Sequence, residues 1–169
     1  MSSSDQTTGR RALLGLLAPA LLAACGFAPV YGSGGPARAL LNRVRIEDPT
    51  NKNAFDLVER LEERLGRPQN VAFRLSYGIT TQSRGLGITP DNTTTRYNID
   101  GTVTYTLSDA VSGTPLAQGE VTTFVSYSAS GSTVATVAAE EDAYARLMRL
   151  LADQIVSELI ASSAGWSVR

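Results

Sequence analysis

The sequence contains no histidine, one cysteine and a single lysine, Lys52. Without histidine the chain cannot build a Ser-His-Asp or Cys-His catalytic site, and it lacks the commonest metal ligand of proteins. The lone cysteine, Cys25, excludes an intrachain disulfide and a zinc site made of several cysteines. Fifteen basic and sixteen acidic residues give a net charge of −1, which argues against nucleic-acid binding. We therefore expect no enzymatic activity, no metal and no dissociable cofactor.

A hydrolase is the enzymatic alternative, because serines and carboxylates are plentiful. The chain has no Gly-x-Ser-x-Gly motif, however, and the sequence pairs no general base with a serine nucleophile. The run Glu140-Glu141-Asp142 resembles an acidic site, but consecutive residues of a helix point in different directions and cannot converge on one ion.

The first 24 residues have the order of an export signal. Arg10 and Arg11 precede thirteen uncharged residues, mostly leucine and alanine, and the run closes on small residues. A membrane-spanning helix is the alternative, but Pro19 interrupts a run that would need about 20 strongly apolar residues. We predict a signal peptide over residues 1–24, and an ordinary basic leader fits its neighbours better than a twin-arginine signal does.

The tetrapeptide Leu22-Ala23-Ala24-Cys25 resembles the lipobox of bacterial lipoproteins. The resemblance implies cleavage between Ala24 and Cys25 and acylation of Cys25, with palmitate among the chains. Two or more acyl chains hold a protein stably on a membrane. Gly26, rather than aspartate, follows the cysteine, which implies the periplasmic side of the outer membrane. Residues 25–39 are rich in glycine and proline and are predicted to form a tether, followed by one domain over 40–169.

Hydrophobic periodicity predicts the elements of that domain. A short strand is expected near 41–47, and a helix follows with Asn53 as its N-cap and with Phe55 on its buried face. Three alternating strands come next, with a loop over 83–92 between the first two. A final helix is expected over 138–163, with the acidic run 140–142 in its first turns, where it would complement the helix dipole.

The order β-α-β-β-β-α predicts an α+β fold of two layers. We expect a four-stranded, mostly antiparallel sheet with two helices on one face and a threonine-rich polar surface on the other. Val156 and Ile160 fall outside the apolar stripe of the last helix, so they are candidates for exposed partner contacts, although looser packing at a terminus is the alternative. Phe27, Pro29 and Tyr31 are further candidates, because aromatic residues are unusual in a flexible linker.

The lipobox is followed directly by Cys25-Gly26-Phe27-Ala28-Pro29-Val30-Tyr31-Gly32. With the element order, this segment resembles the LptE family, the lipopolysaccharide-assembly lipoproteins of the outer membrane. The resemblance implies a non-enzymatic partner that plugs the β-barrel protein LptD and meets lipopolysaccharide. The alternative is a periplasmic auxiliary lipoprotein of a lipid-transport system or a cell-wall synthase. The sequence departs from the family in carrying few basic residues on its strands.

Two arginines border the long loop between the middle strands. Because a guanidinium binds two phosphate oxygens at once, Arg84 and Arg96 are our candidates for contact with the lipid-A phosphates of lipopolysaccharide. The alternative is a pair of solvated loop arginines.

Overall fold

The computed structural model describes residues 36–88, 94–129 and 132–163. A 3₁₀ helix, η1, spans Pro36–Ala39. Strand β1 spans Val44–Ile46 and helix α2 spans Lys52–Leu65. Strands β2, β3 and β4 span Phe73–Ile88, Thr94–Asp109 and Pro115–Ser128, and helix α3 spans Thr133–Ser162. This order confirms the predicted α+β fold.

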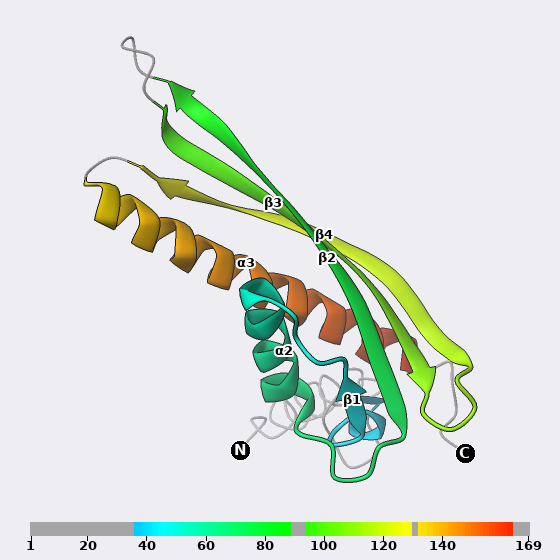
Figure 1. Ribbon diagram of the computed structural model, residues 1–169. Coiled ribbons are helices and arrows are strands. Elements are labelled where there is room, and N and C mark those ends of the chain that lie inside the picture. The colour runs from blue at the N-terminus through cyan, green and yellow to red at the C-terminus, as the bar shows by residue number, and fades with distance from the viewer. Residues whose placement is uncertain (1–35, 89–93, 130–131, 164–169) are drawn as a thin grey trace, which may run out of the picture.

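The four strands form one sheet in the order β1-β2-β3-β4. The short strand β1 runs parallel to β2, and the other two pairings are antiparallel. Figure 1 shows both helices on the same face of the sheet, with the long helix α3 crossing it obliquely. The predicted two-layer sandwich is therefore confirmed.

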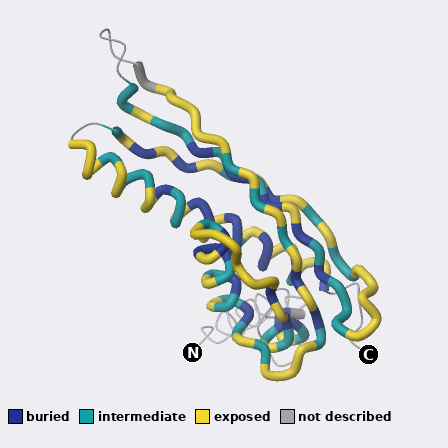
Figure 2. The backbone as a smooth tube through the Cα atoms, viewed as in Figure 1, coloured by how far each residue is buried: buried dark blue, intermediate teal, exposed yellow. Residues whose placement is uncertain are grey.

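Alternate residues of the strands face the helices and build the core. Ile99, Val103 and Leu107 of β3 are fully buried against the helical layer (Figure 2). Gly101 lies between them because α3 approaches the sheet there. A Cβ atom at residue 101 would stand 2.9 Å from Leu147 Cδ2 and 3.0 Å from Leu151 Cδ1.

The opposite face of the sheet, which we call the outer face, is polar. In its middle, Thr80, Thr102 and Thr122 lie side by side on three neighbouring strands. The hydroxyls of Thr102 and Thr122 are 3.1 Å apart and hydrogen-bonded. One residue breaks the pattern: the side chain of Phe124 is on this face and is 64% exposed.

Helix α2 begins earlier than predicted. The N-cap is Asn51 rather than Asn53, and its side-chain oxygen accepts a hydrogen bond of 2.9 Å from the backbone N–H of Ala54. The buried stripe runs through Leu57, Leu61 and Leu65, so Phe55 points outward and is 54% exposed. The prediction that Phe55 faces the core was wrong. Phe55 was assigned to the buried stripe of the helix, but it lies outside that stripe in the structure.

Helix α3 also begins earlier, at Thr133, with Ser132 as its N-cap. The acidic run 140–142 therefore lies about two turns inside the helix. It is too far from the N-terminus to complement the helix dipole, whose effect falls off within the first turn. The prediction of a dipole-stabilising first turn was wrong.

The expected exposure at the end of α3 was also wrong. Val156 is fully buried, and Ile160 is partly buried and packs against the core. Helix α3 contacts both the sheet and α2, and its buried residues form an arc wider than a single stripe. Helical periodicity shows one apolar face and does not reveal that a second helix covers the flank.

The predicted loop between β2 and β3 is shorter than 83–92. Strand β2 continues to Ile88 and pairs with β3 up to Thr94, with register shifts between Gly85, Gly87 and Ile88. Arg84 and Arg96 are consequently strand residues. The glycine-rich sequence looked like a loop, but glycine also permits the bulges by which this pairing extends.

The N-terminal end of the described chain is packed on the domain. Ala37 in η1 and Leu40 after it are 1% and 0% exposed. Residues 36–39 thus belong to the folded part, although the sequence placed them in the tether. No helix of the described ranges is long and apolar enough to cross a membrane. Ala24, Cys25, Phe27, Pro29 and Tyr31 lie outside the described residues.

Candidate functional site

The two arginines predicted as ligand contacts have different surroundings. Arg84 lies on the outer face, and its Nη2 is 2.6 Å from Oδ2 of Asp100 on β3. The other oxygen of Asp100 accepts a hydrogen bond of 3.0 Å from the amide of Asn98. Asn98 in turn accepts one of 3.0 Å from the Ser126 hydroxyl of β4. Arg84 is thus the end of a polar ladder across three strands, and its charge is balanced by Asp100.

Arg96 is exposed and has no hydrogen bond or ion pair with any other residue that the structure describes. It lies next to a hollow of about 330 Å³ beside the end of β4. Arg146 and Asp142 of α3 line the same hollow, together with the serines of the strand end, Ser126 and Ser128. The structure therefore separates Arg84 from Arg96 and brings Arg96 together with a second arginine.

The hollow carries a surplus of positive charge. Arg96 and Arg146 contribute two positive charges and Asp142 one negative charge, and Nε of Arg146 donates a hydrogen bond of 2.9 Å to Oδ2 of Asp142. Bonding through Nε leaves the two terminal nitrogens of Arg146 available, and a guanidinium has five N–H donors. Two such groups, with the hydroxyl of Ser128 beside them, suit an anion with several oxygens, such as a phosphate.

Sequence reasoning did not find Arg146. It is fifty positions from Arg96, and their proximity depends on the early start of α3 and on the pairing of Arg96 with Ser128. No motif or spacing in the sequence signals that arrangement. The acidic run was noticed, but Asp142 was not connected with an arginine of a strand.

A second and larger hollow, of about 900 Å³, lies beside β1 and the turn between β3 and β4. Arg45 and Arg74 line it, but so do Glu47, Asp48 and Asp109. Arg45 is already paired with Asp48 at 3.3 Å. The carboxylate of Asp109 accepts hydrogen bonds from the Ser112 and Val111 backbone, which lower its pKa. These mixed charges do not define one ionic ligand.

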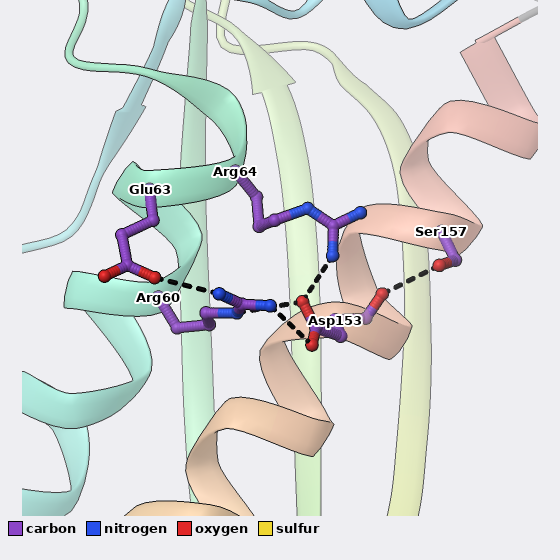
Figure 3. A network of polar contacts seen from close by, with 5 residues as sticks. All are labelled: Arg60, Glu63, Arg64, Asp153 and Ser157. Carbon is purple, nitrogen blue, oxygen red and sulfur yellow. Dashed lines mark hydrogen bonds and ion pairs between the residues drawn. The ribbon is translucent and has the colours of Figure 1, made fainter.

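An ion-pair network fixes the helical layer beneath the sheet (Figure 3). Arg60 of α2 binds both carboxylate oxygens of Asp153 on α3, through Nε and Nη2 at 3.0 Å each. Arg64 reaches the same carboxylate, and Arg60 also donates to Glu63 at 2.9 Å. The hydrogen bond to Asp153, followed by that to Glu63, raises the pKa of Arg60. The network holds α2 against α3 and has a structural role.

A second contact joins α3 to the sheet. The hydroxyl of Tyr105 on β3 donates a hydrogen bond of 2.6 Å to Glu158. Burial, and then this bond, raise the pKa of Tyr105 well above its ordinary value of 10.0. The ring lies over Gly119 of β4, where a Cβ would stand 2.7 Å from the phenolic oxygen. Figure 1 shows α3 crossing the face of the sheet beneath β3 and β4.

The described residues contain no group of three or more histidine, cysteine, aspartate or glutamate side chains that could hold a metal ion. The hollow beside β4 presents guanidinium groups of Arg96 and Arg146, which suit recognition by hydrogen bonds and charge. The fold and this site define a class: a small α+β domain with a polar sheet face and a local cationic hollow.

The family follows from comparison. A family model described as LptE, lipopolysaccharide-assembly, matches residues 41–159, which is well over half of the chain. The chain belongs to the LptE family, as its resemblance predicted, and its general role is that of a lipopolysaccharide-assembly lipoprotein.

Solved structures share the fold. A lipoprotein structure from Caulobacter crescentus has a TM-score of 0.66 and 22% identity, covering 77% of this chain and 97% of the other. Rare lipoprotein B from Shewanella oneidensis has a TM-score of 0.56 and 14% identity, covering 73% and 96%. Lipoprotein B from Nitrosomonas europaea also has a TM-score of 0.56, with 18% identity, covering 72% and 84%. No curated protein matches the sequence.

Proposed function

We propose that this protein is a non-enzymatic lipoprotein of the outer membrane, anchored through lipid on Cys25 with its domain on the periplasmic side. There it would partner the β-barrel protein LptD and take part in the delivery of lipopolysaccharide. Membership of the LptE family carries this proposal. The polar outer face supports it, because a protein that fills a barrel meets a polar lumen.

Within this function, we infer that the hollow beside β4 contacts lipopolysaccharide phosphates. Arg96 and Arg146 would hold the phosphate oxygens, and the hydroxyl of Ser128 would add a donor, since that of Ser126 already donates to Asn98. Arg84 is a weaker candidate than Arg96, because Asp100 already balances its charge. The exposed side chains of Phe124 and Leu86, 64% and 61% exposed, provide apolar surface on the same half of the sheet for the acyl part of the lipid.

Direct binding to lipopolysaccharide tests the phosphate contact. Arg96→Glu and Arg146→Glu should each weaken binding by about tenfold, which corresponds to the loss of one charge-assisted contact of about 1.4 kcal/mol. Arg149→Glu is the matched control, since Arg149 is an exposed arginine of the same helix that does not line the hollow. Equal loss of affinity in all three variants would indicate general charge attraction and would refute the site.

The anchor has its own test. The mass of the mature N-terminus should equal that of a chain beginning at an acylated Cys25. A chain that begins elsewhere, or an unmodified cysteine, would remove the lipoprotein part of the proposal.

A further inference from the structure

One end of the domain differs in charge from the rest. Figure 1 shows the start of the described chain, β1 and the turn between β3 and β4 at one end of the sheet, and the tips of β2 and β3 at the other. Residues 36–48, 65–76 and 107–116 build the first end, which we call the tether end, and they contain five arginines and three acidic residues. The rest of the described chain contains seven basic and eleven acidic residues. The positive charge of the domain is therefore concentrated at the tether end.

Arg38 and Arg74 carry charge at this end that no described residue balances. Both are exposed, and neither has an ion pair with another residue in the described parts of the chain. Arg74 also pairs with Arg45 of β1 in the sheet, and like charges opposed on neighbouring strands repel. Two of the three acidic residues are already engaged, because Asp48 is 3.3 Å from Arg45 and Asp109 accepts hydrogen bonds from its own turn. An anionic surface against this end would relieve the repulsion.

Two exposed valines lie beside these arginines. Val71 and Val111 are 42% and 95% exposed, and both line the hollow of about 900 Å³ together with Arg45 and Arg74. The mixed charges of this hollow do not suit one small ion, but a contact with a surface requires only a net charge with apolar groups beside it. Apolar side chains that enter the headgroup region next to basic residues are typical of proteins that lie on a bilayer.

We propose that the tether end rests on the anionic phospholipid surface of the periplasmic leaflet, with Val111 in the headgroup region and Arg38 and Arg74 against lipid phosphates. The tether argues for a bilayer rather than a soluble partner. The described chain begins at this end, at Pro36, and eleven residues, about 40 Å at full extension, separate it from the proposed lipid on Cys25. A basic patch is a second membrane signal beside an acyl anchor.

The inference rests on the proposed outer-membrane anchoring and adds an orientation to it. The hollow beside β4 lies near the last residues of that strand, at the opposite end of the sheet (Figure 1). With the tether end on the lipid surface, that hollow and the tips of β2 and β3 remain free for the barrel and for lipopolysaccharide. The two contacts are therefore compatible in one protein.

Vesicle flotation tests the contact without the anchor. The mature chain, residues 25–169 with Cys25→Ser, would be mixed at low salt with vesicles of phosphatidylethanolamine and phosphatidylglycerol. Arg38→Gln and Arg74→Gln should each lower the partition coefficient about fivefold, because one arginine near an anionic surface contributes about 1 kcal/mol. Arg149→Gln is the matched control, since Arg149 is an exposed arginine of α3 outside the tether end. No acyl chain is present in this assay, so its result does not depend on the anchor or on the barrel.

A fluorophore on an introduced cysteine reports the orientation of the acylated protein in reconstituted vesicles. A label on Val111→Cys should shift its emission to the blue and be quenched by spin-labelled phospholipid. Val134→Cys is the control, because Val134 is 80% exposed at the start of α3, at the opposite end. Labelling of Cys25 in the unsubstituted chain gives the background, and strong labelling there would refute the anchor rather than the tether end.

Flotation that Arg149→Gln preserves and the other two variants weaken, with stronger quenching at residue 111 than at 134, supports the proposal. It would be overturned by no flotation of the parent chain, by equal losses in all three arginine variants, or by equal quenching at the two positions. Flotation only with vesicles that contain lipopolysaccharide would also overturn it.

Discussion

Removal of the Asp153 carboxylate is expected to loosen the contact between α2 and α3. The carboxylate receives two hydrogen bonds of 3.0 Å from Arg60, in the paired geometry that makes guanidinium contacts strong, and a further contact from Arg64. All three side chains are about one third exposed, at 29%, 32% and 33%, so water screens part of the attraction. Asp153→Ala also leaves two arginines close together without their shared anion.

The magnitude follows from these contacts. An exposed ion pair contributes about 0.2–1 kcal/mol, and two partly screened pairs with good geometry should together contribute about 1–2 kcal/mol to the free energy of unfolding. For a chain of this size, that loss corresponds to a decrease in Tm of roughly 2–8 °C. Asp142→Ala is the control on the same helix. It removes one exposed pair with Arg146 and should cost about 0.3–0.5 kcal/mol.

Urea denaturation followed by circular dichroism gives the two free energies under the same conditions. The difference between Asp153→Ala and Asp142→Ala should shrink in high salt, because screening weakens the arginine contacts. If both variants lose the same small amount of stability, the network does not fix the helical layer and the reasoning fails.

Two further predictions concern the contact between α3 and the sheet. Gly101→Ala should destabilise the fold by about 1–3 kcal/mol, because the new methyl group would stand 2.9–3.0 Å from the nearest carbons of Leu147 and Leu151. Unchanged stability in urea denaturation would mean that α3 is not held so close to β3. The raised pKa of Tyr105 means that its ionisation is easier in the unfolded chain, so the free energy of unfolding should fall as pH rises above about 10. Tyr105→Phe should show a smaller fall over that range, and identical curves for both proteins would contradict this cause.

The architecture could be predicted from the sequence because its periods are clear. The alternation from Tyr97 to Leu107 matches a strand whose inner residues are buried, and the element order allows few arrangements. The helix boundaries were less certain, since several polar residues near each start can serve as N-cap. The N-caps in the structure are Asn51 and Ser132, and both precede the helix starts that the apolar patterns indicated.

The site was only half predictable. Arg96 was predicted as a candidate because it borders the long loop between the middle strands. Arg146 belongs to the site only through tertiary contacts. Val156 was misjudged for a similar reason, because it is fully buried in a helix that packs against α2 as well as against the sheet. The hydrophobic periodicity of a helix or strand indicates which side faces its main neighbour. Contacts between elements that are distant in the sequence produce no comparable pattern in the sequence.

Co-purification from native membranes tests the central claim most directly. The lipoprotein, expressed at its natural level with a C-terminal tag, would be captured from detergent-solubilised outer membranes and its partners identified by mass spectrometry. The proposed function predicts a stable, near-stoichiometric complex with an outer-membrane β-barrel protein of the LptD type. Recovery of the lipoprotein without a barrel, or with a periplasmic lipid-transport component or a cell-wall synthase in its place, would contradict it.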